Sequence, residues 1–154
     1  MIDTYRYAIV YFTLFGVLLL VSGLWLFGMK AGFSIEIITD YYLGNDALFT
    51  QPKSNEGLLE IAVPHLGATG LFIMVSAHFI LFTPQRERRI MVWLIVLWFL
   101  SALVNIFAPF AIIAGVNVFV GIKLMAFIVF ELLGLYLLWV VFQAAFRGLH
   151  HKKN

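Results

Sequence analysis

The stretch Ile90–Ala114, IMVWLIVLWFLSALVNIFAPFAIIA, contains no charged residue and decides the class of protein. A helix needs about 20 residues to cross the ~30 Å hydrocarbon core of a bilayer, and this run is long enough. Similar runs cover about residues 7–29, 58–82 and 119–146. With 63% hydrophobic and 12% charged residues, a soluble domain of this size could not hide its apolar surface. We therefore expect one all-α domain over residues 1–154, an integral membrane four-helix bundle.

The basic residues predict the orientation of this bundle, because cytoplasmic segments of membrane proteins are enriched in Lys and Arg. By this rule both termini and the turn 83–89 are expected to be cytoplasmic, and the acidic loop 30–57 is expected outside. In a bacterium this arrangement corresponds to a multi-pass protein of the inner (plasma) membrane. The residues that decide it are Arg6, Arg86, Arg88, Arg89, Arg147, Lys152 and Lys153.

The outer loop is expected to contain structure of its own. Ser34 is a suitable N-cap for a short helix that Gly44 would end in a left-handed turn. The apolar face of that helix would lie in the headgroup region, and the helix would shield the ends of the spans. Ser54 is a suitable N-cap for the second span.

The sequence lacks the residues that several classes of function require. The chain contains no cysteine, which excludes disulfides, thiolate metal sites and iron–sulfur clusters. It also lacks a P-loop, an HExxH motif and a Ser/His/Asp grouping. Because the basic residues lie at helix ends, no nucleic-acid partner is expected. An enzyme acting on its own is not expected either.

His65 and His78 on the second span are the most suggestive polar pair. They are separated by roughly 20 Å of helix rise, which would place one imidazole near each membrane face. Membrane cytochromes of the b type use a similar spacing to hold two haems. The other spans carry no histidine, so a second axial ligand would come from a homodimer, a partner subunit or a residue other than histidine. Alternatively, both histidines form hydrogen bonds inside the bundle.

Glu60, His65 and Lys123 are expected at similar depths, near the outer face. If the second and fourth spans face each other, these residues would form one polar pocket. Such a pocket could ligate a metal, bind a quinone headgroup, or hold a haem propionate through Lys123. The alternative is that Lys123 snorkels outward to the headgroups.

The remaining polar and small residues are expected to join helices. Glu131 and Asn105 come to similar depths, and a hydrogen bond between them would satisfy both. Glycines in two spans would allow close helix approach. These are Gly16, Gly23, Gly67 and Gly70.

A pattern in the outer loop and second span resembles a group of small four-span bacterial membrane proteins that look like cytochrome-type bundles. It consists of Tyr41-Tyr42-Leu43-Gly44, Pro52-Lys53-Ser54, Glu60, Pro64-His65 and His78. The first histidine of the family's pattern is replaced here by Val63, which would remove one site if that position is a ligand. The resemblance implies a membrane role linked to redox chemistry or metal.

These residues suggest three alternative functions. The first is a membrane electron-transfer protein or subunit that binds b-type haem or quinone. The second is a non-catalytic accessory subunit, without cofactor, of a larger membrane complex. A small transporter is disfavoured because the chain lacks an inverted repeat and broken helices. The first reading requires a homo-oligomer or a larger complex to complete the coordination.

Overall fold

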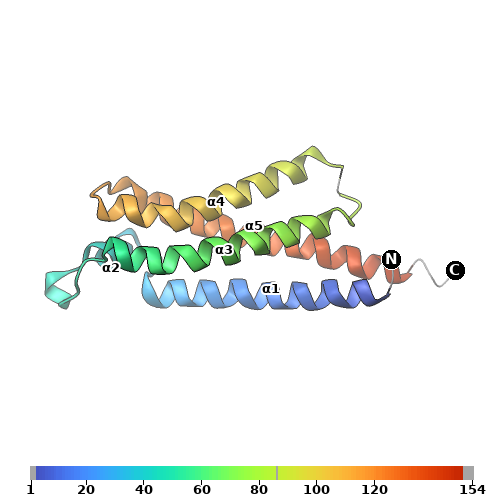
Figure 1. The fold of residues 1–154 in the computed structure, drawn as a ribbon, viewed down its shortest axis with the longest axis horizontal. Coiled ribbons are helices and arrows are strands. Elements are labelled where there is room, and N and C mark those ends of the chain that lie inside the picture. Colours follow the sequence, from blue (N-terminus) through green and yellow to red (C-terminus); the bar gives the residue numbers. More distant parts are fainter. Residues whose placement is uncertain (1–2, 86, 151–154) are drawn as a thin grey trace.

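The computed structural model describes residues 3–85 and 87–150, with side chains described for 5–85 and 87–146. Four long helices lie lengthwise against one another as a bundle (Figure 1). Each is long and apolar enough to cross a membrane, which confirms the expected all-α membrane architecture. The elements are α1 (Asp3–Lys30), α2 (Ile35–Leu43), a 3-10 turn η1 (Asp46–Leu48), α3 (Asn55–Ile80), α4 (Arg89–Ile113) and α5 (Val118–His150).

The short helix and the start of the second span form as the sequence predicts. The Ser34 hydroxyl accepts the N–H of Ile37 at 3.2 Å, and Gly44 ends α2 at a φ of 79°. The Ser54 hydroxyl accepts the N–H of Gly57 at 3.1 Å at the start of α3. Both cap predictions are therefore confirmed.

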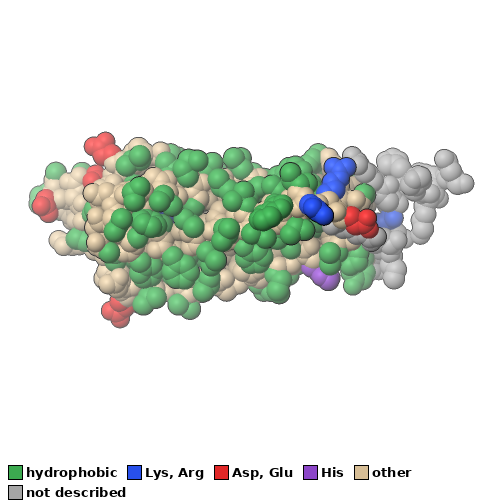
Figure 2. All heavy atoms as spheres, turned by 90° about the horizontal axis from the view of Figure 1, so that it is seen from above, with side chains coloured by type: hydrophobic (Ala, Val, Ile, Leu, Met, Phe, Trp, Pro, Cys, Tyr) green, Lys and Arg blue, Asp and Glu red, His purple; other side chains and the backbone are tan. Residues whose placement is uncertain are grey.

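The two ends of the bundle differ in composition. The start of α1, the connecting residues 81–85 and 87–88, and the end of α5 lie at one end, which we call the basic end (Figure 1). The segment 31–54 lies at the opposite end, and Figure 2 shows most of the visible acidic side chains there. The side chains of Arg86, Arg147, Lys152 and Lys153 lie outside the described part of the chain. The shared end of the termini agrees with the charge pattern, and the assignment of that end to the cytoplasm stays a prediction.

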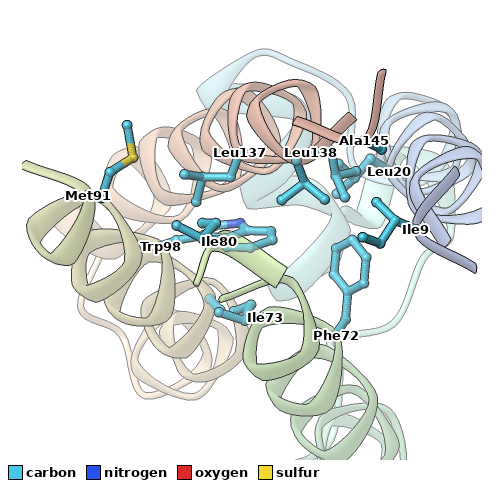
Figure 3. Packing of buried hydrophobic residues seen from close by; sticks show 12 residues of the cluster. Ile9, Leu20, Phe72, Ile73, Ile80, Met91, Trp98, Leu137, Leu138 and Ala145 are labelled. Atoms are coloured by element: carbon cyan, nitrogen blue, oxygen red, sulfur yellow. The ribbon is translucent and has the colours of Figure 1, made fainter. Parts of the chain in front are cut away.

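Trp98 of α4 lies at the centre of the main core (Figure 3). Its side chain is fully buried, and its indole N–H donates to the backbone carbonyl of Phe130 on α5 at 3.0 Å. Small residues let the helices approach: a Cβ on Gly16 would stand 2.9 Å from Leu138, and one on Gly134 would stand 2.9 Å from Leu20. Gly16 therefore has the packing role predicted for it, and apolar side chains fill the centre of the bundle.

A second core lies under α2. Ile38 and Tyr42 of α2 pack against Leu58, Ile112 and Val120 at the ends of the long helices. Burial, and then the nearby Tyr41 hydroxyl, raise the pKa of Tyr42 well above its usual range. The buried face of α2 thus lies on the bundle itself and shields the helix ends, as expected, whereas the expectation that the apolar face lies in the headgroup region is wrong for Ile38 and Tyr42.

Candidate functional site

The half of α3 nearest to α2 is exposed on almost every side. Between Leu59 and Ala68, Ala62 alone is buried. Glu60 and His65 both lie on this exposed stretch. In a membrane span this surface meets lipid or another protein, so these two polar side chains are directed away from the core of their own bundle.

The ring of His65 is oriented by its own helix. Its Nδ1 lies 2.8 Å from the backbone carbonyl of Ile61, one turn earlier. A carbonyl oxygen only accepts hydrogen bonds, so Nδ1 must carry the proton. In the neutral ring, Nε2 then keeps its lone pair, and no other hydrogen bond of His65 occurs within the described residues. A metal-binding imidazole is commonly oriented in this way, by a backbone carbonyl on its other nitrogen.

His78 lies near the basic end of α3 and is also exposed. Its ring meets the Phe82 ring edge to face, with centroids 5.6 Å apart. At about 100° per residue, His65 and His78 point roughly 140° apart around α3. One flat neighbouring surface therefore cannot contact both histidines. The prediction that they form hydrogen bonds inside the bundle is wrong, because both side chains are exposed.

Lys123 of α5 is a buried cation. Its side chain is 7% exposed, and its ammonium donates to both oxygens of Asn105 on α4. The bond to the Asn105 backbone carbonyl is 2.8 Å long. The expectation that Lys123 snorkels to the headgroups is therefore wrong, because two acceptors inside the bundle hold its charge.

Pro109 explains why a backbone carbonyl in the middle of α4 is free to accept this bond. In a helix the carbonyl of Asn105 normally accepts the N–H of the residue four positions later, and that residue is Pro109. Proline has no N–H, so the Asn105 carbonyl loses its helical donor. The Lys123 ammonium supplies a donor from α5 in its place.

An aromatic pair borders this lysine. The Phe27 ring of α1 lies 5.6 Å from the Lys123 Nζ, within reach of a cation–π interaction. The same ring stacks on Phe127 of α5, with centroids 3.9 Å apart. Lys123 is thus held by contacts from α1 and α4, two neighbours of its own helix.

Glu131 is buried as well, with 7% of its surface exposed. The predicted hydrogen bond between Asn105 and Glu131 is wrong, because no such bond occurs among the described residues and the partner of the Asn105 side chain is Lys123. Within the described residues Glu131 forms no hydrogen bond. A Cβ on Gly23 of α1 would stand 3.4 Å from its Oε1, so Gly23 makes room for the carboxyl group.

Glu60, His65 and Lys123 do not form the predicted polar pocket through side-chain contacts. Among the described residues, no hydrogen bond or ion pair links Glu60 or His65 to Lys123. Within the same described residues, no group of three or more His, Asp or Glu side chains could hold a metal ion. Gly67 and Gly70 have open space where a Cβ would stand, so within this chain they make no close helix contact.

Comparison with known proteins places the chain in a family. Residues 32–153 match the model of the Aq_1264_TM family, a transmembrane helical domain. The chain belongs to this family. No curated protein and no solved structure matches it.

The Aq_1264_TM match spans α2 to α5, so it includes His65, His78, Lys123 and Asn105. The match covers three of the four candidate spans, and together with α1 they make the chain a multi-pass membrane protein with four spans. The family match does not include the link to cytochromes that the sequence pattern implies. That link depends on the chemistry of α3.

The contact between Asn105 and Lys123 was missed by sequence reasoning, because the partner of Asn105 was expected to be Glu131. The sequence contained the signal, because a proline four residues after Asn105 indicates that the Asn105 backbone carbonyl has no helical N–H donor. A lysine on the neighbouring span is the natural donor for it. The indole donor of Trp98 was also overlooked, since no sequence feature points to Phe130 as its acceptor.

Proposed function

We propose that this protein is a redox-linked membrane subunit that binds b-type haem, or a quinone headgroup, on the exposed surface of α3. His65 is the principal ligand and His78 a second one. The single observation that supports this proposal is the ring of His65. Its Nδ1 proton is engaged by the Ile61 carbonyl, and its Nε2 lone pair is left for a ligand.

The location of the histidines indicates where a cofactor would sit. The centre of the bundle is filled by Trp98, Leu137 and Leu138, each with no exposed surface, whereas both histidines are exposed. A haem would therefore bind between this chain and a neighbour, which is a second copy or a partner subunit. That neighbour would supply the second axial ligand. Because the two rings point about 140° apart, each histidine would meet its own neighbour.

The other residues proposed for the site have different roles. Glu60 lies five residues before His65, about 140° away around α3, and on this exposed surface it would accept a hydrogen bond from a quinol hydroxyl at a place separate from the His65 ring. Lys123 is committed to Asn105, so its part in holding a haem propionate would require the loss of that contact. A bound haem supplies one-electron chemistry, while the chain orients the imidazole and excludes water.

We also place the protein in the bacterial inner membrane, with the basic end of the bundle in the cytoplasm. The positive-inside rule supports this orientation. The apolar helices and the acidic segment at the opposite end agree with it.

The direct test is an optical spectrum of the detergent-purified protein, oxidised and then reduced with dithionite, after expression with ample haem. A sharp α-band of b type in the reduced protein is expected. It should be lost or shifted in His65→Ala, while Ser22→Ala, which changes an exposed polar side chain of α1 that also bonds to its own helix, serves as the control and keeps it. A flat spectrum in the wild-type protein would contradict haem binding.

The His78→Ala variant shows whether each chain has one haem site or two. If both histidines are ligands, haem content per chain falls by about half, since each site binds independently. An unchanged haem content in His78→Ala would restrict the site to His65.

A second function also has an observation in its favour. Glu60, His65 and His78 are polar and exposed on a membrane span, where a neighbouring subunit would satisfy them without any cofactor. In an accessory subunit of this kind, the protein is colourless and co-purifies with a larger complex. Replacing His65 would then release the chain from that complex.

A further inference from the structure

The turn between α2 and α3 leaves two large apolar side chains exposed. Leu48 is 64% exposed and Phe49 is 92% exposed. Many other exposed apolar residues lie on the long helices, where lipid covers them. Figure 1 shows the turn, coloured cyan, projecting beyond the ends of the four long helices.

The turn is held firmly in this shape. Asn45 and Thr50 exchange backbone hydrogen bonds of 3.1 Å each, which close the turn at its base. The Asn45 side chain accepts the N–H of Ala47 and donates to the Asp40 carboxylate, with 2.9 Å for each bond. The turn is thereby anchored to the end of α2.

Phe49 itself adopts a backbone conformation that costs free energy. Its φ of 53° and ψ of 31° lie in the left-handed region, and it is the described residue other than glycine with a positive φ. A bulky aromatic residue is rarely found there. Strain of this kind is retained where it positions a side chain for a task, and a turn whose backbone is already held in shape loses little backbone entropy on binding.

The charges around the turn indicate the chemistry of a partner. Asp40 and Asp46 flank the turn, with Glu36 on α2 and Glu56 at the start of α3, and these four acidic residues outnumber Lys53 and Lys30 at the same end of the bundle. The Lys53 ammonium is drawn onto the Tyr41 ring at 4.7 Å. An acidic surround repels an anionic lipid surface and attracts a basic one.

We propose that Leu48 and Phe49 form a docking knob for a protein partner that is either water-soluble or attached to the outer face of the membrane that this chain spans. The partner receives the Phe49 ring in an apolar pocket with a basic rim. The proposal concerns the outer segment and does not rest on haem or quinone binding at α3. Aromatic anchors at the centre of an interface commonly dominate its binding energy, and surrounding charges steer the encounter.

The test uses the full-length chain in the membranes of cells that produce it. A benzophenone amino acid is placed at Phe49, and at Leu14 of α1 as a control that is 57% exposed on a membrane span. Irradiation at position 49 is expected to give one discrete adduct with a protein of the outer side, identified by mass spectrometry, which position 14 does not give. Adducts with lipid alone, with a second copy of this chain alone, or none at position 49, would overturn the proposal.

The captured protein is then tested against the purified chain in nanodiscs of zwitterionic lipid. Phe49→Ser is expected to weaken binding at least about tenfold, as for an interface anchor. Asp46→Asn and added salt should weaken it several-fold, because they remove or screen the acidic surround. Binding that ignores Phe49→Ser, or that ignores both salt and Asp46→Asn, would overturn the proposal.

Phe49→Gly separates docking from folding. Glycine adopts a positive φ without strain, so the thermal stability of this variant should be equal to or above that of the wild type. Its binding should be lost together with the ring. A marked loss of thermal stability in Phe49→Gly would show that the ring supports the fold, and would contradict its assignment as a docking residue.

Discussion

The ammonium of Lys123 donates to the backbone carbonyl of Asn105, the carbonyl whose helical donor is removed by Pro109. A break in the hydrogen bonding of one membrane helix is thus repaired by a side chain from the next. In hydrocarbon an unpaired carbonyl is costly, and so is an unpaired ammonium. Each group satisfies the other at the contact between α4 and α5.

This relationship predicts a coupling between Lys123 and Pro109. In Pro109→Ala, the new N–H supplies the missing helical bond to Asn105, so the carbonyl no longer depends on the lysine. The cost of Lys123→Met should therefore be about 1–2 kcal/mol smaller in the Pro109→Ala background than in the wild type. Unfolding of the four proteins in mixed detergent micelles measures this difference. Additive costs would contradict the repair of α4 by Lys123.

Asn105 and Glu131 are predicted to differ in their sensitivity to substitution. Asn105→Leu removes one acceptor from a buried ammonium and should lower the free energy of unfolding by about 1–3 kcal/mol. Glu131→Leu removes a buried carboxyl that forms no hydrogen bond in the described residues, so it should be neutral or stabilising. Thermal unfolding of both variants gives the comparison. The reverse order would show that Glu131 has the partner originally expected for it.

Two glycines should respond in opposite ways to an added side chain. Gly16→Val places a bulky group against Leu138 and Phe72, and overpacking of this kind costs about 1–3 kcal/mol. Gly67→Ala adds a methyl group in open space and should stabilise the isolated chain by about 0.5–1 kcal/mol through helix propensity. Melting temperatures in detergent test both. A large loss of stability in Gly67→Ala would indicate a close neighbour at this surface.

Tyr42 predicts a loss of stability at alkaline pH. Burial raises the pKa of its hydroxyl in the folded state, whereas in the unfolded chain the pKa is about 10. Stability due to the neutral hydroxyl is full below the unfolded pKa and is lost as the pH rises above it. The free energy of unfolding should thus fall above about pH 10, and fall less in Tyr42→Phe. Equal slopes in the two proteins would contradict this assignment.

The spans, their number and the helix caps could be predicted from the sequence because their signals are local. An uninterrupted apolar run such as Ile90–Ala114 has one stable solution in lipid, and Ser34 and Ser54 cap the residues that directly follow them. The direction of each polar side chain could not be predicted in the same way. A helix that is apolar all round carries no pattern to separate its inner face from its outer face.

Lys123 and His65 illustrate this limit. Lys123 near a helix end fits snorkelling by position alone, yet it points inward because Pro109 on another span creates an acceptor for it. His65 fits an interior hydrogen bond, yet it satisfies its Nδ1 within its own helix and stays exposed. Both outcomes depend on contacts that arise only once the bundle has packed or the ring has taken a rotamer.

The central claim, that His65 presents a free Nε2 to a haem, is tested most directly by the reduced optical spectrum of His65→Gly with and without added imidazole. Free imidazole fits the space that the missing side chain leaves and offers the same nitrogen donor. The account predicts a b-type α-band in the wild type, its loss in His65→Gly, and its return when imidazole is added. A wild-type protein without the band, or a band that is indifferent to His65→Gly, would contradict the account.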